Sequence, residues 1–300
     1  MDALAQPGVR VTAEELLGLA ALVRRGRRGA RLRVSPLSGG AAIQRQGGGL
    51  DLHEIRPWAL GDEVRSIDRN ASARRGELHT RLFRDEREPR HLVVVDLRPS
   101  MLFGTRRAFR SAAALEAACL VGWDLVQRGA RLDMAALMAA GPVPLRGGVG
   151  EPAMRALAAG LARLNDEALR ERSDRDPPLD EALAAATARA VVQGSLTLIS
   201  ALDSPGRDLA AALRTLGRRG AIRIVRIRDR IEAEIPAGRY AYATAGGPRR
   251  LAAIGRRGGP APEADRALAD LPIAQVTIGA DAAPADMLAT LGALDRERSR

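Results

Sequence analysis

Residues 96–101, DLRPSM, have the residue types of a cation site at the end of a strand. Asp96 closes the apolar run 91–96, HLVVVD, and Ser100 follows four residues later. Such a run is typical of a buried strand, and parallel sheets bind their ligands at the carboxyl ends of strands. Carboxylate and hydroxyl oxygens are ligands that Mg²⁺ prefers. Further ligands would have to come from the ends of neighbouring strands.

Other groups for nucleophilic or metal chemistry are scarce. They are one cysteine, Cys119, and three histidines, His53, His79 and His91. A single cysteine excludes an internal disulfide and a Cys-rich zinc site. Cys119 lies in an Ala-rich stretch, where a buried thiol acts as a small apolar side chain. The GGVG sequence at 147–150 is not followed by Gly-Lys-Ser/Thr, so it is no phosphate-binding loop. We therefore expect no catalytic residue and predict that the chain is not an enzyme.

All the basic residues of the chain are arginines. The 300 residues contain 47 basic residues, all arginine, against 36 acidic ones, which gives a net charge of +11. Residues 91–210 are neutral, so the surplus lies toward the two ends. A basic surface can bind nucleic acid or another anion. However, aromatic residues are 2% of the chain, too few for a stacking platform. A nucleic-acid-binding module is therefore the alternative rather than the first prediction.

No part of the sequence predicts a membrane span or an export signal. No uncharged apolar stretch reaches the roughly 18 residues that a spanning helix needs. The first ten residues lack the basic start and apolar run of a signal peptide. We therefore expect a cytoplasmic protein.

Strands and helices alternate along most of the chain. Apolar runs predict strands at 91–96, 130–140, 195–202, 221–229 and 273–279. Helical spacing predicts helices at 11–25, 105–128, 151–164, 179–192, 206–219 and 284–294, with a loop at 165–178. The Gly- and Pro-rich residues 141–150 indicate a hairpin. This alternation predicts an α/β fold with a mostly parallel central sheet flanked by helices.

The stretch 49–86 resembles the signature of the domain of unknown function 58 family. The residues that carry the match are Arg56, Trp58, Gly61, Asp62, Glu63, Arg65, Ile67, Asp68, Ser72, Ala73 and Arg74. The following VVVDLRPSMLFG resembles the start of the family's von Willebrand A-like domain. The resemblance implies a bacterial cytoplasmic protein with a Rossmann-like A domain, associated with a MoxR-type AAA+ ATPase. It implies no established catalytic activity.

The family's metal-ion-dependent adhesion site is degenerate in this sequence. Asp96 and Ser100 match the family's D-x-S-x-S ligands, but Arg98 replaces the middle serine and Ala201 replaces an aspartate. The loop 173–183, which the resemblance expects to supply a threonine, contains none. A divalent cation needs several well-placed oxygens, so we predict no bound metal and no Mg²⁺ cofactor. A Mg²⁺-dependent ligand-binding A domain stays as a second alternative, with Ser200 and Asp203 as substitute ligands.

Two arrangements of charge are left open. The Arg98 guanidinium either pairs with Asp96 in the place of the cation or points to solvent. Likewise, the charged residues of the family signature either form a salt-bridged block on the A domain or a solvated loop. In the family pattern the residue after Asp68 is tryptophan, and here it is Arg69.

These observations predict two regions and a binding function. Residues 1–87 hold a helix and a small charged subdomain, and residues 88–300 form the von Willebrand A-like domain. The chain is expected to be a non-enzymatic protein–protein interaction module, an adaptor of a MoxR-type AAA+ ATPase in assembly or maturation of a complex. The expected interaction surface comprises Arg98, Met101, Phe103, Ser200 and Asp203, with the loop 165–178 beside them.

Overall fold

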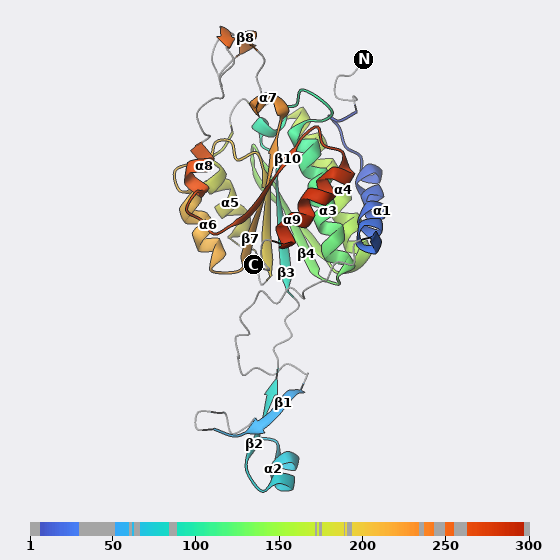
Figure 1. The fold of residues 1–300 in the computed structure, drawn as a ribbon, viewed down its shortest axis with the longest axis vertical. Coiled ribbons are helices and arrows are strands. Elements are labelled where there is room, and N and C mark those ends of the chain that lie inside the picture. The colour runs from blue at the N-terminus through green and yellow to red at the C-terminus, as the bar shows by residue number, and fades with distance from the viewer. Residues whose placement is uncertain are drawn as a thin grey trace. The chain divides into compact units, whose positions relative to one another are not determined.

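A six-stranded sheet forms the centre of the larger part of the chain (Figure 1). From edge to edge it contains β10 (Ala274–Gly279), β7 (Ala221–Arg228), β6 (Ser195–Ser200), β3 (Arg90–Asp96), β4 (Arg131–Met138) and β5 (Gly141–Gly148). Neighbouring strands are parallel except for the β4–β5 pair, which is antiparallel. Numbered by chain order, the strands run 3-2-1-4-5-6, the order of a doubly wound Rossmann-like sheet. The order reverses between β3 and β6, which is where such sheets bind ligands.

The computed structural model describes most but not all of the chain. The described residues are 7–29, 52–59, 62, 67–83, 89–171, 173, 176–188, 190, 194–233, 237–242, 250–254 and 263–296. They form two compact units, one of residues 1–35 with 89–300 and one of residues 36–88. We call the first the A domain and the second the inserted unit.

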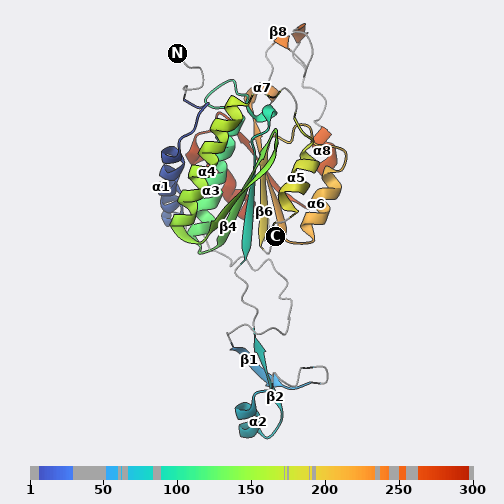
Figure 2. The same ribbon diagram turned by 180° about the vertical axis from the view of Figure 1, so that it is seen from behind.

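Helices cover both faces of the A-domain sheet (Figures 1 and 2). One face packs against α3 (Arg110–Gln127), α4 (Gly150–Arg170) and α9 (Pro284–Arg296), and α1 (Ala13–Gly29) packs on these helices. The other packs against α5 (Leu179–Thr187), α6 (Leu209–Gly217) and α8 (Glu263–Leu268). The central strands β3 and β6 are buried along almost their whole length, as apolar runs in a two-sided sheet require. The predicted α/β fold with a mostly parallel sheet is confirmed.

The division of the chain differs from the predicted regions in one respect. Helix α1, expected to belong to an N-terminal region 1–87, packs in the A domain instead. Its apolar stripe includes Leu16, Leu19 and Val23, which are buried in the same core as α3 and α4. Trp123 of α3 also donates a hydrogen bond to the carbonyl of Leu16 at 3.3 Å. The small subdomain is therefore an insertion between α1 and β3.

Several element boundaries also differ from the predicted ones. Helix α3 begins at Arg110 rather than at 105, because the backbone N–H of Thr105 donates to Asp229 and that of Phe109 donates to Gly8. Helix α4 continues to Arg170, so the expected loop at 165–178 is helical in its first part. Buried residues recur at helical spacing across that boundary, which explains the extension: they are Leu157, Leu161, Leu164 and Ala168.

The segment between β7 and β10 adds short elements that the sequence did not predict. They are α7 (Arg230–Ala233), α8 and a two-stranded antiparallel sheet of β8 (Gly238–Tyr242) and β9 (Arg250–Ile254). A one-turn 3₁₀ helix, η3 (Pro99–Met101), follows β3. Both α7 and η3 come directly after the carboxyl end of a parallel strand, so they lie at the ligand-binding edge of the sheet.

The inserted unit consists of a hairpin and one short helix. Strands β1 (Leu52–Pro57) and β2 (His79–Phe83) pair antiparallel, and α2 (Arg69–Arg75) precedes β2. Asp68 caps α2 by accepting from the backbone N–H groups of Asn70 and Ala71, each at 2.9 Å. Gly76 ends it at φ 73°, a left-handed conformation that glycine adopts without strain.

Candidate functional site

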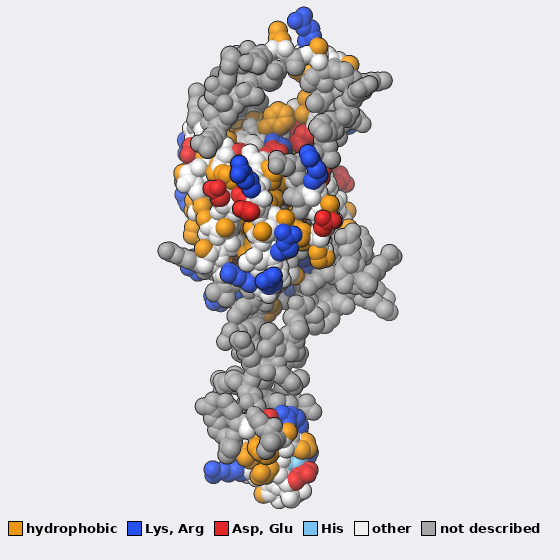
Figure 3. Space-filling view, turned by 90° about the vertical axis from the view of Figure 1, so that its left-hand side faces the viewer, with side chains coloured by type: hydrophobic (Ala, Val, Ile, Leu, Met, Phe, Trp, Pro, Cys, Tyr) orange, Lys and Arg blue, Asp and Glu red, His pale blue; other side chains and the backbone are white. Residues whose placement is uncertain are grey.

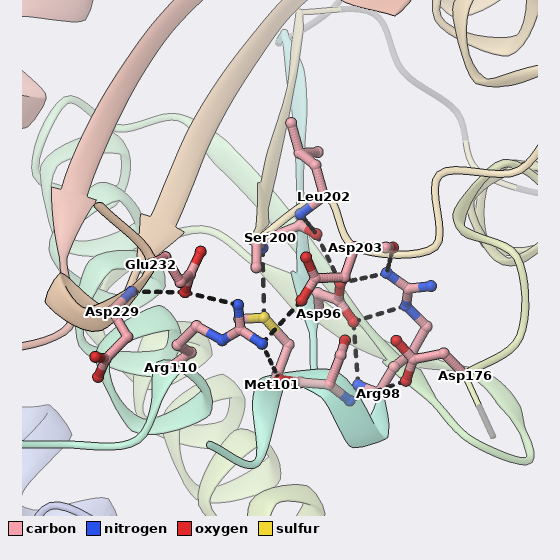
Figure 4. Close-up of polar contacts among 12 residues, drawn as sticks. Asp96, Arg98, Met101, Arg110, Asp176, Ser200, Leu202, Asp203, Asp229 and Glu232 are labelled. Atoms are coloured by element: carbon pink, nitrogen blue, oxygen red, sulfur yellow. Dashed lines mark hydrogen bonds and ion pairs between the residues drawn. The ribbon is translucent and has the colours of Figure 1, made fainter. Parts of the chain in front are cut away.

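The Arg98 guanidinium forms a buried, two-pronged ion pair with Asp96 at the carboxyl end of β3 (Figure 4). Nε lies 3.0 Å from Oδ1 and Nη2 lies 2.8 Å from Oδ2. Both side chains are 0% exposed. Of the two arrangements left open by the sequence, the structure shows pairing, since a buried carboxylate is costly without a partner.

The same guanidinium joins two further loops to β3. Nη1 donates to the carbonyl of Pro177 at 2.6 Å, and Nη2 donates to the carbonyl of Asp203 at 2.9 Å. Pro177 precedes α5, and Asp203 follows β6. Burial alone would lower the pKa of Arg98, but the charge and hydrogen bonds of Asp96 outweigh it and raise that pKa. Arg98 is therefore a permanent cation that connects three segments.

Two serines complete the inner part of the site. Ser200 Oγ donates to Asp96 Oδ2 at 2.6 Å and accepts from the Leu202 N–H at 2.8 Å. The backbone N–H of Ser100 donates to Asp176 Oδ1 at 2.9 Å, whereas Ser100 Oγ has no hydrogen-bond partner among the described residues. Asp96 thus accepts hydrogen bonds on both oxygens, and its negative charge is already neutralised by Arg98.

A second arginine, Arg110, lies at the start of α3 beside this pair. It is 7% exposed and forms ion pairs with Asp203 at 2.8 Å and Glu232 at 2.9 Å. It also donates to the carbonyl of Ser100, and its guanidinium carbon lies 5.6 Å from the centre of the Phe103 ring. Arg110 therefore ties η3, the loop after β6 and α7 together under an aromatic side chain.

Asp229, at the end of β7, extends the network on the side of α7. It accepts from both the N–H and the hydroxyl of Thr105, and from the N–H of Ile231 at 2.9 Å. Burial on its own would raise the pKa of Asp229, but these hydrogen bonds outweigh it and lower the pKa below its ordinary value. The carboxylate therefore stays ionised and fixes the loop that carries Phe103.

The expected interaction surface needs a correction. Arg98, Met101 and Ser200 are each 0% exposed, so they cannot touch a partner. Arg98 turns inward because Asp96 needs a counter-charge, and Met101 is part of the core under η3. Phe103 at 41% and the Asp203 side chain at 42% are the exposed members of the predicted set.

The backbone of the loop after β6 is strained at this site. Leu202 (φ 64°) and Ser204 (φ 46°) are the non-glycine residues with positive φ in the described part of the chain. Such conformations cost free energy and persist where surrounding contacts impose them. Arg98 and the Leu179 N–H, which donates to the carbonyl of Ser204 at 2.8 Å, impose this one.

The oxygen ligands at the degenerate site do not match a divalent cation. Ala201, at the position expected for an aspartate, offers no side-chain oxygen, and the Arg98 guanidinium occupies the oxygens of Asp96. Within the described ranges, no three His, Cys, Asp or Glu side chains are grouped so that they could hold a metal ion. A cation added here would meet the positive charge of Arg98 at close range.

The other candidates for catalysis or metal binding are Cys119 and the histidines, and their described contacts are structural. Cys119 is fully buried in α3, and burial raises its pKa, so the reactive thiolate is disfavoured. His91 is buried, and its Nδ1 lies 2.8 Å from Ser195 Oγ. Burial, with Arg223 and Arg128 nearby, lowers the pKa of His91 to about 4. His79 is buried in the inserted unit, with Nδ1 2.9 Å from the carbonyl of Glu77, and His53 carries no described side chain.

The family signature has internal roles in the inserted unit. Arg56 pairs with Asp62 at 2.8 Å, and Asp62 also accepts from the Ala59 N–H at 2.9 Å. Asp68 is the N-cap of α2, the Trp58 N–H donates to the Leu78 carbonyl at 2.7 Å, and Arg74 is exposed. Three other members of the signature lie outside the described residues: Gly61, Glu63 and Arg65.

Sequence reasoning missed the residues that reach the site from a distance. Arg110 and Glu232 were not predicted to take part, and Asp176 and Pro177 were covered only by the general expectation that the loop 165–178 lies beside the surface. Asp229 ends the predicted strand 221–229 and Glu232 lies three residues after it, so the rule that locates sites at carboxyl ends of strands could have found them. No described helix has the length and apolar character needed to span a membrane.

The chain is similar to two solved structures and matches one protein family. A crystal structure of the conserved hypothetical protein BatB from Bacteroides thetaiotaomicron is similar at 13% identity and a TM-score of 0.45, covering 70% of this chain and 97% of that one. An aerotolerance-related membrane protein from Bacteroides fragilis is similar at 10% identity and a TM-score of 0.42, covering 69% and 99%. No curated protein matches the chain. The family described as "Protein of unknown function DUF58" matches residues 54–245. Because this match covers more than half of its length, the chain belongs to the DUF58 family.

Proposed function

We propose that this chain is a non-enzymatic protein–protein interaction module that binds its partner without a metal ion. The observation that carries the proposal is the Arg98 clasp, by which we mean the bonds from Arg98 to Asp96, Pro177 and Asp203. A fixed, buried cation holds the three segments that a bound cation would otherwise hold. Because the guanidinium is part of the chain, the edge of the sheet is assembled without any cofactor.

The proposed contact surface consists of exposed side chains on the segments next to the Arg98 clasp. Phe103 is 41% exposed and lies over Arg110, while Asp203 and Glu232 are 42% and 28% exposed in their side chains. An aromatic anchor with a charged rim, resting on a rigid base, is typical of protein interfaces. We call Phe103, Asp203 and Glu232 the edge surface.

A protein partner is favoured over nucleic acid at the A domain. On the face drawn in Figure 3, arginines and acidic residues of the A domain are interspersed with apolar side chains rather than gathered by sign. Nucleic-acid binders present a stripe of one charge. The family resemblance suggests the partner, a MoxR-type AAA+ ATPase, with the chain acting as a cytoplasmic adaptor in a bacterium during assembly or maturation of a complex.

The test is capture of a MoxR-type AAA+ ATPase by the immobilised full chain, with and without EDTA. We expect equal dissociation constants in the two conditions. Phe103→Ala should weaken binding about tenfold, as loss of a central aromatic anchor does. Val149→Ala is the matched control. Val149 is 48% exposed and follows β5, whose last residue pairs with the start of β4, so it lies at the edge of the sheet away from Phe103. This change should leave the affinity unchanged.

Three outcomes would overturn the proposal. Chelator-sensitive capture would indicate the Mg²⁺-dependent A domain instead. Retention on duplex DNA at about 0.2 M salt, where non-specific phosphate binding is weak, would indicate the nucleic-acid alternative. Equal losses from Phe103→Ala and Val149→Ala would show that the edge surface is not the contact.

A further inference from the structure

We propose that the inserted unit carries a second docking surface, which binds an acidic protein segment containing an apolar side chain. The surface consists of helix α2 and the turn after it, with Arg69, Ala73, Arg74, Arg75 and Leu78 exposed, and with one exposed acidic residue, Glu77, in the turn. We call it the α2 surface. It lies in a different compact unit from the edge surface, so the two proposals stand or fall separately.

Helix α2 carries basic residues and no acidic ones. The inserted unit, residues 36–88, contains nine arginines and nine acidic residues, so the unit as a whole is neutral. Helix α2 nevertheless has three arginines and no acidic residue among its seven positions. Three of the unit's nine arginines thus lie on this one short helix, between Asp68 at its start and Glu77 in the turn after it. Concentrated charge of one sign attracts a partner of the opposite sign.

Helix stability does not explain all three arginines. Arg74 and Arg75 lie in the last turn, where cations interact favourably with the helix dipole. Arg69 is the first helical residue, where a cation is unfavourable. By helical geometry it lies on the opposite side of α2 from the buried Ala71, so it points away from the unit's interior. An arginine that costs helix stability and faces outward is suited to an external partner.

The guanidinium groups of α2 make few hydrogen bonds or ion pairs with other described residues. Arg74 Nε donates to the carbonyl of Asn70 at 3.2 Å, a contact within the same helix. No ion pair among the described residues engages Arg69 or Arg75. Their donors are therefore available for carboxylates, which match the planar fork of a guanidinium.

The backbone around Leu78 is fixed, so an exposed apolar side chain is presented in a defined place. Leu78 is 53% exposed. Its carbonyl accepts from the Trp58 N–H at 2.7 Å, and the next residue, His79, donates its N–H to Ser72 Oγ at 2.9 Å. Ala73, exposed one turn after Arg69, leaves room for an approaching chain. A fixed apolar side chain on the same short segment as these arginines fits an acidic peptide with a leucine-type side chain. Leu78 offers no aromatic face on which the bases of a single strand could stack.

The test measures binding of the full chain to a fluorescein-labelled synthetic peptide of Glu, Asp and Leu by fluorescence anisotropy. A peptide with Lys in place of its acidic residues and a single-stranded DNA of similar length are the comparison probes. We expect the acidic peptide to bind and the lysine peptide not to bind. The triple variant Arg69→Gln, Arg74→Gln, Arg75→Gln should weaken binding about tenfold, and Leu78→Ser should weaken it several-fold.

Matched variants separate position from charge and from misfolding. The triple change Arg155→Gln, Arg163→Gln, Arg170→Gln removes equal charge from exposed residues of α4 and should leave binding unchanged. Arg69→Lys, Arg74→Lys, Arg75→Lys keeps the charge and should keep most of the affinity. Phe103→Ala should bind the peptide normally, because it tests only the edge surface. The proposal is overturned if the α2 and α4 triple variants bind alike, or if the DNA binds more tightly than the acidic peptide.

Discussion

Two arginines of the A domain and two arginines of the inserted unit are used in opposite ways. Arg98 and Arg110 are almost fully buried, and their described hydrogen bonds and ion pairs are all with carboxylates or carbonyls. Arg69 and Arg75 are exposed, and no described ion pair holds them. One residue type therefore organises a site in one unit and offers charge to a partner in the other. The net charge of +11 does not distinguish the two kinds of arginine, because it contains no information on burial or contacts.

The physical basis of the difference is desolvation. A guanidinium withdrawn from water must have its charge and its N–H groups matched inside the protein. Arg98 meets this demand with four hydrogen bonds, two of them to Asp96. An exposed guanidinium is matched by water, so it needs no internal partner and stays available for binding. The comparison predicts large effects from the first kind of arginine and small effects on stability from the second.

The largest expected effect is that of Arg98→Met. This change leaves Asp96 buried beside an apolar side chain, so we expect the free energy of unfolding to fall by about 3–5 kcal/mol. Urea denaturation followed by circular dichroism measures it. Arg163→Met, on the exposed side of α4, is the control and should change the free energy by less than about 1 kcal/mol.

A double variant sharpens the same comparison. In Asp96→Asn with Arg98→Met, no unpaired charge remains, so part of the lost stability should return. An additive double variant would show that the two side chains do not act as a pair, and the account of the Arg98 clasp would fail.

His91 is a buried titratable group without an acidic partner among the causes of its pKa shift, so its protonated form should be unfavourable. It is buried with Arg223 and Arg128 as its charged neighbours, and its pKa is lowered from 6.5 to about 4. Between these pH values the unfolded chain binds a proton that the folded chain does not bind. The free energy of unfolding should therefore fall as the pH decreases from about 6.5 to about 4, by about 2–3 kcal/mol.

Two variants isolate this contribution. His91→Asn keeps an acceptor for Ser195 but has no titrating ring, so its stability should decline less over the same pH range. Ser195→Ala keeps the histidine and should keep the decline. Urea denaturation at a series of pH values measures both. If the decline is the same in His91→Asn as in the unaltered chain, His91 is not the group that titrates.

Much of the A domain follows from short stretches of sequence. The apolar runs that became β3 and β6 identify buried parallel strands, and chain order then brings Asp96 and Ser200 to the same edge. Both predictions depend only on local residue pattern and on the right-handed connection of parallel strands. The pairing of Arg98 with Asp96 was one of two alternatives, because burial of a particular side chain cannot be read from its neighbours in sequence.

The rest of the site depends on contacts between distant residues. Arg98 reaches Pro177 and Asp203, which are 79 and 105 positions away in the chain. The exact path of each loop decides these contacts, and no periodic pattern reports it. The start of α3 was misplaced for a related reason: the N–H groups of Thr105 and Phe109 bond to Asp229 and Gly8 rather than within a helix.

The smallest expected effect is on the stability of α2. In the triple variant Arg69→Gln, Arg74→Gln, Arg75→Gln, removal of Arg69 relieves an unfavourable dipole interaction and removal of the other two loses a favourable one. These contributions oppose each other, so the local free energy of opening should change by less than about 0.5 kcal/mol. Hydrogen exchange of peptides that cover α2, read by mass spectrometry in the full chain, measures it. Asp68→Ala, which removes the N-cap, should lower the protection of the same peptides by about 1 kcal/mol and confirms that the measurement responds. A loss of more than about 1 kcal/mol in the triple variant would mean that these arginines hold the inserted unit together, as Arg98 holds the A domain, and would remove the reason to assign them to a partner.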